Sequence, residues 1–208
     1  SSSCYGIPKK YPTAEDEIID LKYPYAFSKH IAEQAIIHWS KVYKINFISL
    51  RLFNVYGTRA RTTGAYGAVM GVFLKQRLAK KPLTVIGSGL QKRDFVHVKD
   101  VCEVFIKSLY SKKNNQIYNI GSSKPKTIIS LAKRLGNKII HIPKRPGEPE
   151  VTFANTKKVT RELKWLPKIN FEEGIDDLIN NISYWKNAPL WNKNNIKKAT
   201  KLWFKYLK

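Results

Sequence analysis

A tyrosine and a lysine one helical turn apart are the clearest candidates for chemistry in this sequence. Tyr25 and Lys29 open a run whose apolar positions recur about every 3.6 residues, which predicts a helix over residues 25–43. On a helix these two side chains share one face. A nearby cation favours the phenolate form and lowers a tyrosine pKa, so the pair is suited to acid–base chemistry. The apolar positions that continue this face are Ala32, Ala35, Ile36 and Trp39.

The pattern Tyr-x-x-x-Lys is a weak signal by itself. With 11 Tyr and 30 Lys in 208 positions, chance alone produces such pairs, and Tyr5 with Lys9 is a second one. Gly6 and Pro8 exclude a helix there. Only Tyr25 and Lys29 therefore have a helical context.

Composition indicates one large domain or two small ones with a sizeable core, since 43% of the 208 residues are hydrophobic. We expect a cytoplasmic protein without membrane spans, because no long apolar run or signal peptide occurs and the two cysteines form no disulfide framework. A net charge of +23 can attract nucleic acid, but the charge is mostly lysine and spread along the chain. In the basic tail, Trp203, Tyr206 and Leu207 at helical spacing favour a packing face over base stacking.

The order of hydrophobic runs and turn residues predicts alternating strands and helices. We expect His30 and His38 to be surface or partly buried neutral histidines rather than catalysts, and His97 to be structural. Strands are predicted over 46–56, 83–87, 95–98, 117–121 and 139–143. Helices are predicted over 25–43, from about 64 to 80, and over 98–110, 128–135, 156–163 and 171–185, with Gly136 and Asn137 ending the fourth.

Five motifs in a fixed order resemble a known family. They are the serine-rich segment 1–6 (SSSCYG), the Tyr25–Lys29 pair, residues 51–57 (RLFNVYG) and residues 93–100 (RDFVHVKD), followed by 145–148 (RPGE). This order is similar to the extended short-chain dehydrogenase/reductases, and within them to the NAD-dependent nucleotide-sugar epimerase/dehydratase family, UDP-glucose 4-epimerases in particular. The resemblance runs from Ser1 to about Trp185.

The resemblance implies an α/β fold: the C-terminal part of a Rossmann-type doubly wound parallel sheet, plus a smaller mixed α/β substrate-binding domain. Residues 1–62 would belong to the NAD-binding domain and carry the tyrosine helix. Residues 63–186 would be mainly the substrate-binding domain, with some strands returning to the Rossmann sheet, and 187–208 a basic aromatic tail. The family's glycine-rich cofactor loop is not in this sequence, so we expect the C-terminal part of an enzyme that is inactive alone.

A second glycine cluster, residues 64–71, is not expected to bind the dinucleotide. Seven residues separate it from the preceding strand, and no acidic residue follows at the distance expected for a ribose ligand. By resemblance this segment belongs to the nucleotide end of the substrate site.

The resemblance also implies a hydride mechanism with NAD as cofactor and no metal. Tyr25, as phenolate, would take a proton from a sugar hydroxyl, usually at C4, while Ser1 shares that proton and Lys29 holds the nicotinamide ribose. The carbon's hydride would pass to NAD, and its return to the other face of the 4-keto sugar would invert the centre. Ser1, Tyr25, Lys29 and Phe53 are the implied cofactor contacts.

The substrate contacts implied by the resemblance are Ser2, Ser3, Asn54, Ile86, Arg93, Arg145 and Glu148. A guanidinium can fork onto phosphate oxygens, which makes Arg145 and Arg93 candidates for a diphosphate clamp. The family's dehydratases carry Asp-Glu after the catalytic hydroxyl and its decarboxylases a Glu, whereas this chain carries Ser2 and Ser3. That difference favours C4 epimerisation of a UDP-hexose or UDP-hexuronate, as in polysaccharide biosynthesis.

Several alternatives stay open at this stage. They are a dehydratase, decarboxylase or reductase of the same family, a non-catalytic nucleotide-sugar-binding protein, and a basic nucleic-acid-binding protein. The sugar, the nucleotide and the choice of NAD or NADP are undetermined, because the ribose-reading residue lies upstream in the family. Full-length members usually form homodimers through the tyrosine helix.

Overall fold

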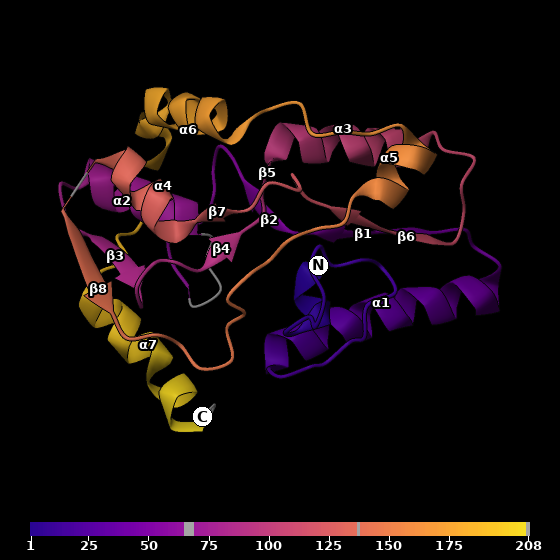
Figure 1. Ribbon diagram of the computed structural model, residues 1–208, viewed down its shortest axis with the longest axis horizontal. Helices are drawn as coiled ribbons and strands as arrows, with labels where there is room; N and C mark the ends of the chain where they lie inside the picture. Colours follow the sequence, from indigo (N-terminus) through magenta and orange to yellow (C-terminus); the bar gives the residue numbers. More distant parts are fainter. Residues whose placement is uncertain (65–68, 137, 207–208) are drawn as a thin grey trace. The chain divides into compact units, whose positions relative to one another are not determined.

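The computed structural model of the chain describes residues 1–64, 69–136 and 138–206, in which helices and strands alternate (Figure 1). The helices are α1 (Pro24–Tyr43), α2 (Val69–Leu78), α3 (Val98–Leu109), α4 (Ile128–Leu135), α5 (Lys157–Leu163), α6 (Phe171–Asn180) and α7 (Lys193–Tyr206), with the 3-10 helices η1 (Ser2–Tyr5) and η2 (Ile182–Trp185). The strands are β1 (Ile48–Leu52), β2 (Asn54–Tyr56), β3 (Leu83–Ile86), β4 (Lys92–Arg93), β5 (Phe95–His97), β6 (Gln116–Ile120), β7 (Lys126–Thr127) and β8 (Ile139–Ile142).

These elements form two compact units. Unit 1 contains residues 1–55, 94–125 and 152–168, and unit 2 contains residues 56–93, 126–151 and 169–208. Both units are discontinuous in sequence, since the chain passes between them several times. Residues 187–208, which the sequence presents as a tail, lie in unit 2.

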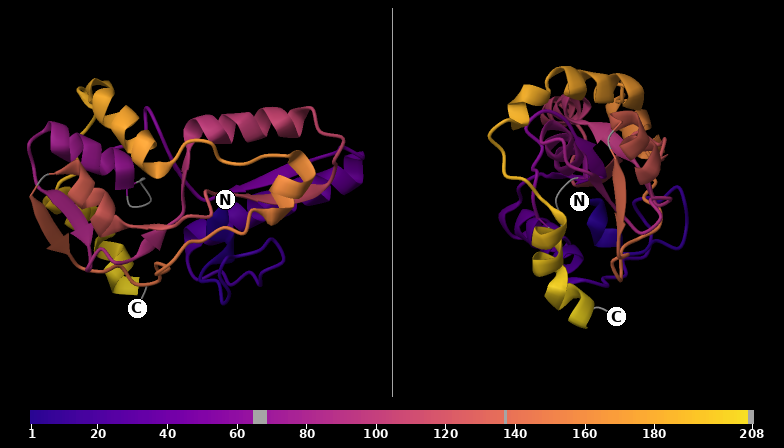
Figure 2. Two further views of the ribbon diagram at one scale, coloured as in Figure 1. Left: turned by 45° about the horizontal axis from the view of Figure 1, so that its top comes forward. Right: turned by 90° about the vertical axis from the view of Figure 1, so that its left-hand side faces the viewer.

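Unit 1 is built on the parallel strands β1 and β6, which pair from Ile48 opposite Gln116 to Leu52 opposite Ile120. Because side chains alternate along a strand, β1 presents two different faces. Ile48, Leu50 and Leu52 pack against an apolar cluster that includes Val101 and Val104 of α3. In Figure 1 and in the left view of Figure 2, α3 runs along this pair. The cluster is completed by Tyr118 and Ile120 of β6 and by Val159, Leu163 and Trp165 in and after α5.

The other face of β1 is polar and meets α1. Ser49 and Arg51 on this face bond to Glu33 of α1. Helices therefore contact both faces of a parallel strand pair, which is the layering of a doubly wound α/β fold. The α/β class predicted from the sequence is confirmed.

Unit 2 contains both parallel and antiparallel strand pairs. Its strands β3 and β8 pair in parallel, while β4 and β7 pair antiparallel. The helices α2 and α4 bury Phe73, Leu131 and Leu135 beside the fully buried Leu83 of β3. Gln76 of α2 fixes this packing, because its side-chain amide donates to Thr84 Oγ1 (2.8 Å) and to the carbonyl of Trp191 (2.7 Å).

Most predicted elements are confirmed within one or two residues, but two are divided. The predicted strand 46–56 breaks at Phe53, because β1 pairs with β6 whereas β2 pairs with β5. The predicted helix 171–185 ends at Asn180, where the side chain of Asn181 bonds back to the carbonyl of Asp177, and η2 follows. The expected glycine cap at Gly136 is present with φ +73°.

Two helices whose sequence spacing predicts an apolar face bury only part of that face. On α1, Ile36 and Trp39 are 52% and 58% exposed, Ala32 and Ala35 are exposed too, and the buried side chains are Ala26 and Glu33. On α7, Tyr206 is 69% exposed, whereas Ile196 and Thr200 are buried. The packing predictions for Leu207 and the helix predictions for residues 65–68 and Asn137 lie outside the described residues. No helix in the described ranges is long and apolar enough to cross a membrane.

Candidate active site

The serine-rich segment forms a tight turn of 3-10 helix in unit 1. Ser1 caps η1, and its hydroxyl oxygen accepts from the backbone N–H of Ser3 at 3.3 Å. The turn ends at Gly6, whose φ of +64° favours glycine. A Cβ at this position would lie 1.7 Å from the carbonyl oxygen of Asp20. Glycine at position 6 therefore lets the segment fold back against the loop that leads to α1.

The Tyr25–Lys29 pair lies at the start of α1, as predicted. Pro24 occupies the first helical position, where its missing N–H costs nothing. The ammonium of Lys29 is 5.5 Å from the ring centroid of Tyr25, with Tyr25 half-buried and Lys29 exposed. Because η1 packs against α1, the serine segment and the phenol–amine pair belong to one local structure.

A buried ion pair ties α1 to the sheet. The guanidinium of Arg51 grips the Glu33 carboxylate with two hydrogen bonds, Nε to Oε2 at 3.0 Å and Nη2 to Oε1 at 2.7 Å. The side chains are only 4% and 7% exposed. Burial raises the pKa of Glu33, but the hydrogen bonds and charge of Arg51 outweigh it, so the pKa lies below the ordinary value. The pair is therefore ionised and fully bonded.

The same arginine holds the serine segment. Its Nη1 donates to the Tyr5 hydroxyl at 2.7 Å, and that hydroxyl donates to Asn119 Oδ1 of β6 at 2.7 Å. Burial raises the pKa of Tyr5, against the opposing charge of Arg51, so its phenol stays protonated and donates. Asn119 in turn donates to the carbonyl of Thr13 at 2.9 Å. Arg51 thus connects η1, α1, β1 and β6.

Sequence reasoning did not identify this network. Arg51 entered only as the first letter of a motif, and Glu33 and Tyr5 were assigned no role. A signal was present, because Arg51 lies between Leu50 and Leu52 in a predicted strand and Glu33 lies four residues after Lys29 on α1. A charge at a position that periodicity places inside indicates a buried partner of opposite charge.

Phe53 and Asn54 follow at the end of β1. Phe53 is 8% exposed and packs with Cys4, Tyr5 and Ala154. Asn54 accepts from the hydroxyl of Thr152 at 2.8 Å. The structure therefore brings Phe53 against the serine segment, and places Asn54 beside it at the carboxyl end of the strand, where α/β sheets bind ligands.

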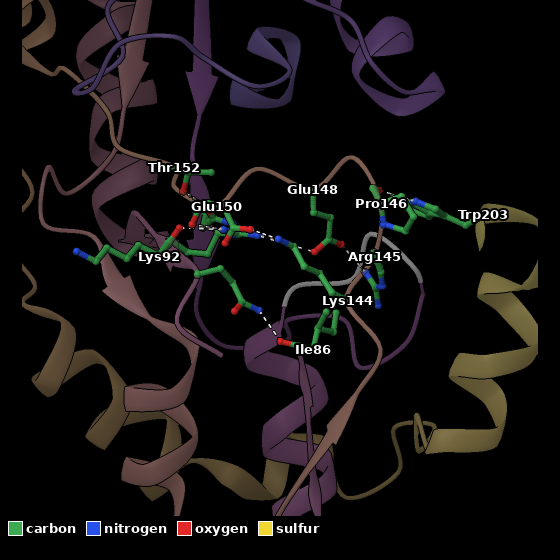
Figure 3. Close-up of polar contacts among 12 residues, drawn as sticks. Ile86, Lys92, Lys144, Arg145, Pro146, Glu148, Glu150, Thr152 and Trp203 are labelled. Atoms are coloured by element: carbon green, nitrogen blue, oxygen red, sulfur yellow. Dashed lines mark hydrogen bonds and ion pairs between the residues drawn. The ribbon is translucent and has the colours of Figure 1, made fainter. Parts of the chain in front are cut away.

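In unit 2, Arg93 meets Arg145 and Glu148, which lie more than fifty residues later in the sequence. The Glu148 carboxylate accepts from Arg145 Nη1 at 3.0 Å, and Arg93 Nη2 lies 3.9 Å from its second oxygen. Both guanidinium groups are mostly buried, with 11% and 13% exposure. Figure 3 shows Glu148 and Arg145 on the loop that runs from Lys144 to Glu150. Two cations around one carboxylate give this loop a site for negatively charged oxygens.

The loop is fixed at both ends. The backbone N–H of Lys92 donates to the carbonyl of Glu150 at 2.8 Å, and Lys144 pairs with the Glu150 carboxylate. At the other end, Trp203 Nε1 donates to the carbonyl of Pro146 at 2.9 Å (Figure 3). Ile86, also predicted to contact substrate, ends β3 and accepts from Gln91 Nε2 at 3.0 Å. No motif predicted the contact of Trp203.

The residues present fit the nicotinamide end of NAD. A hydroxyl-lined turn, a half-buried phenol and an exposed ammonium one turn further along α1 supply the donors that a ribose and a carboxamide require. His97 is not among them, since it caps α3 by accepting from the N–H of Lys99. Within the described ranges, no three His, Cys, Asp or Glu side chains gather in a way that could hold a metal ion.

A parallel strand pair covered by helices on both faces, with a phenol–amine pair and a serine turn near its carboxyl end, defines a Rossmann-type α/β protein of the dehydrogenase kind. Comparison with known proteins agrees. The profile of the NAD dependent epimerase/dehydratase family matches residues 1–121. The chain belongs to this family.

Relatives and solved structures support the same assignment. UDP-glucose 4-epimerase 2 of Arabidopsis thaliana is 31% identical over 208 residues, covering 86% of this chain and 58% of its own length. The dTDP-4-dehydro-6-deoxyglucose reductase of Escherichia coli is 32% identical over 180 residues, with coverages of 82% and 56%. The crystal structure of UDP-glucuronic acid 4-epimerase from Bacillus cereus, in complex with UDP-glucuronic acid and NAD, superposes with a TM-score of 0.81 at 29% identity, covering 88% of this chain and 59% of that one. The chain thus spans about 60% of the length of its relatives.

Proposed function

We propose that this chain carries the catalytic and nucleotide-sugar-binding residues of an NAD-dependent epimerase that inverts C4 of a UDP-hexose or UDP-hexuronate. The observation that carries the proposal is the juxtaposition of η1 with the Tyr25–Lys29 pair at the start of α1. NAD, when bound, supplies the hydride acceptor and donor.

In this proposal Tyr25 removes the proton from the sugar C4 hydroxyl as the hydride leaves the carbon, and returns it when the hydride comes back to the other face. Ser1 shares this proton through its hydroxyl. Lys29 contributes the positive charge beside the phenol ring and hydrogen-bonds the nicotinamide ribose, while Phe53 packs against the cofactor. In this proposal the residues of the chain hold the reacting groups in place. The hydrogen bond between Ser1 and Ser3, which orders the η1 turn, supports that role.

Ser2, Ser3 and Asn54 contact the sugar in this proposal, and Ile86, Arg93, Arg145 and Glu148 contact the nucleotide. The approach of two guanidinium groups to one loop supports a diphosphate ligand. We further propose that Glu148 exchanges part of its contact with the arginines for the nucleotide ribose when the diphosphate binds.

The test uses the full-length protein that contains this chain, because the activity is proposed for the whole enzyme. We expect it to interconvert UDP-glucose and UDP-galactose, or the corresponding uronates. Tyr25→Phe removes the acid–base hydroxyl and is expected to lower kcat by about a hundredfold to ten-thousandfold. Tyr43→Phe, the same change at a 59% exposed position of the same helix, is the matched control and is expected to retain activity. Equal rates in both variants would contradict the mechanism.

A reductase is the second candidate, and it is favoured by the 32% identity to the E. coli dTDP-4-dehydro-6-deoxyglucose reductase. The two reactions differ in their use of cofactor. An epimerase returns the hydride and shows no net oxidation or reduction, whereas a reductase consumes one reduced nicotinamide for each 4-keto sugar. Following the absorbance of reduced nicotinamide during turnover distinguishes the two reactions.

We also propose that the full-length protein forms a homodimer through α1. This helix exposes Phe27 (55%), Ile31 (49%), Trp39 (58%) and Val42 (56%), more large apolar side chains than an isolated surface helix requires. Substituting Ile31 and Trp39 by Glu is expected to convert the dimer to a monomer in sedimentation.

Cys4 and Cys102 are free thiols, which supports placement in a reducing compartment such as the cytoplasm.

A further inference from the structure

The C-terminal helix α7 packs on unit 2 along one face. Ile196, Thr200 and Trp203 recur at spacings of four and three residues, and the first two are 6% and 2% exposed. Leu202, on another side of the helix, is 65% exposed. The docked face of α7 therefore ends at Trp203.

Trp203 makes two contacts with the loop that carries Arg145. Its indole N–H donates to the carbonyl of Pro146 at 2.9 Å, and the guanidinium carbon of Arg145 lies 5.8 Å from its ring centroid (Figure 3). The first contact fixes the backbone directly after Arg145. The second places the guanidinium over an aromatic ring, which attracts cations at this distance.

Stacking and hydrogen bonding use different parts of a guanidinium. The planar face meets the ring, whereas the N–H groups lie in the plane and point outward. Arg145 makes a contact of each kind, since its guanidinium carbon lies over the Trp203 ring and its Nη1 donates to Glu148 at 3.0 Å. An arginine oriented in this way can exchange a carboxylate for phosphate oxygens without losing its support, because both anions accept the same in-plane fork.

We propose that Trp203 is a positioning residue for Arg145, and that α7 is thereby part of the machinery that binds the diphosphate. This inference rests on the proposed function, which assigns Arg145 to a nucleotide diphosphate. It gives a role to the basic aromatic segment at residues 187–208, whose lysines by themselves specify none.

The experiment measures binding of UDP and of uridine to the full-length protein by titration calorimetry. Trp203→Ala is expected to weaken UDP binding about three- to tenfold, the range of one cation–π contact and one hydrogen bond. Uridine binding should change less than about twofold, because uridine has no phosphate for Arg145 to hold. Leu202→Ala is the matched control on the same helix and should leave both affinities unchanged.

A double-mutant cycle separates positioning from general loosening of unit 2. In an Arg145→Ala background, Trp203→Ala should have no further effect on UDP binding, because the side chain that it positions is absent. Trp203→Phe keeps an aromatic face but loses the N–H donor, so it should show an intermediate loss. If Trp203→Ala does not fold, Trp203→Leu, which keeps the volume without the aromatic ring, provides the same comparison.

Two results overturn the inference. Equal weakening of UDP and uridine would mean that Trp203 only stabilises the fold, and additive losses in the cycle would mean that it acts independently of Arg145. If the wild-type protein bound neither UDP nor UDP-sugars, the proposed function would fail and the role of Trp203 with it. If the wild-type protein binds UDP but the Trp203 variants show no loss specific to UDP, only the role of Trp203 is overturned.

Discussion

The region around α1 in unit 1 and the Arg145 loop in unit 2 hold their charged groups in different ways. In unit 1, Arg51 and Glu33 are 4% and 7% exposed, and Arg51 also donates to the Tyr5 hydroxyl of η1 and to the carbonyl of Glu15. In unit 2, Glu148 is 24% exposed and pairs with an arginine three residues away on the same loop. The first arrangement fixes the segments that carry Ser1 and Tyr25, whereas the second leaves the Glu148 carboxylate in reach of water.

This difference indicates how each region is used. A buried and fully hydrogen-bonded pair is costly to disturb, because either partner left alone is an unpaired charge in a poorly solvated environment. A partly exposed pair contributes little to stability and can exchange partners. We therefore expect substitutions in unit 1 to appear mainly as losses of stability, and substitutions in the Arg145 loop mainly as losses of ligand affinity.

The largest effect is expected for Arg51→Met. The substitution keeps an unbranched side chain but leaves Glu33 buried without its partner, which should lower the free energy of unfolding by about 3–5 kcal/mol. Urea unfolding of the full-length protein, followed by fluorescence, measures this loss. The double variant Glu33→Leu with Arg51→Met removes both charges and should recover most of the loss. A change below about 1 kcal/mol in the single variant would remove the contrast between the two regions.

Arg145→Ala should show the opposite pattern. Loss of a charge-assisted hydrogen bond is expected to weaken UDP binding by about 1.5–3 kcal/mol. The free energy of unfolding should change less than in Arg51→Met, because Glu148 is 24% exposed, lies three residues away on the same loop and is left in reach of water. Arg145→Lys keeps the charge but loses the planar fork, so its UDP affinity should fall between those of the wild type and the alanine variant. A loss of stability as large as that of Arg51→Met would contradict the comparison.

The sequence predicted the elements better than their connections. Helical spacing placed Tyr25 and Lys29 on one face of α1, and hydrophobic runs predicted the strands β1 and β6. Both signals depend only on residues that are close together in the sequence. The pairing of Tyr5 with Asn119 spans 114 residues, and that of Trp203 with Pro146 spans 57, so no local pattern specifies either. The break at Phe53 also follows from tertiary pairing, since β1 and β2 join different partner strands.

The candidate site shows the same division. The resemblance to a family suggested Arg93, Arg145 and Glu148, and the structure brings these three within ion-pair distance. The resemblance did not suggest Glu33. A single acidic residue on a helix with a polar side is usually exposed, so its type alone does not mark Glu33 as buried. What decides the role of Glu33 is the position of Arg51 on the facing strand, which depends on the fold of the whole unit.

The smallest effect is expected from acid, and it compares two carboxylates directly. Arg51 holds the pKa of Glu33 below its ordinary value despite burial, so the folded state favours the ionised form. The stabilisation is therefore fully present above the unfolded pKa of about 4.3 and is lost as the pH falls through the lower folded value. Glu33→Gln cannot titrate, so the gap in unfolding free energy between wild type and variant should narrow below about pH 4.

Glu172 in unit 2 is the matched control for this prediction. Its hydrogen bond to Lys126 also lowers its pKa, but the pair is 36% and 50% exposed. Because water screens such a pair, Glu172→Gln should differ only a little from the wild type in unfolding free energy at neutral pH. Acid should change this difference little. Unfolding curves for the wild type and both variants between pH 3 and pH 7 test this difference. If both variants differed equally from the wild type in unfolding free energy, and both differences decreased in acid, burial of the Glu33–Arg51 pair would not explain the contrast between the regions.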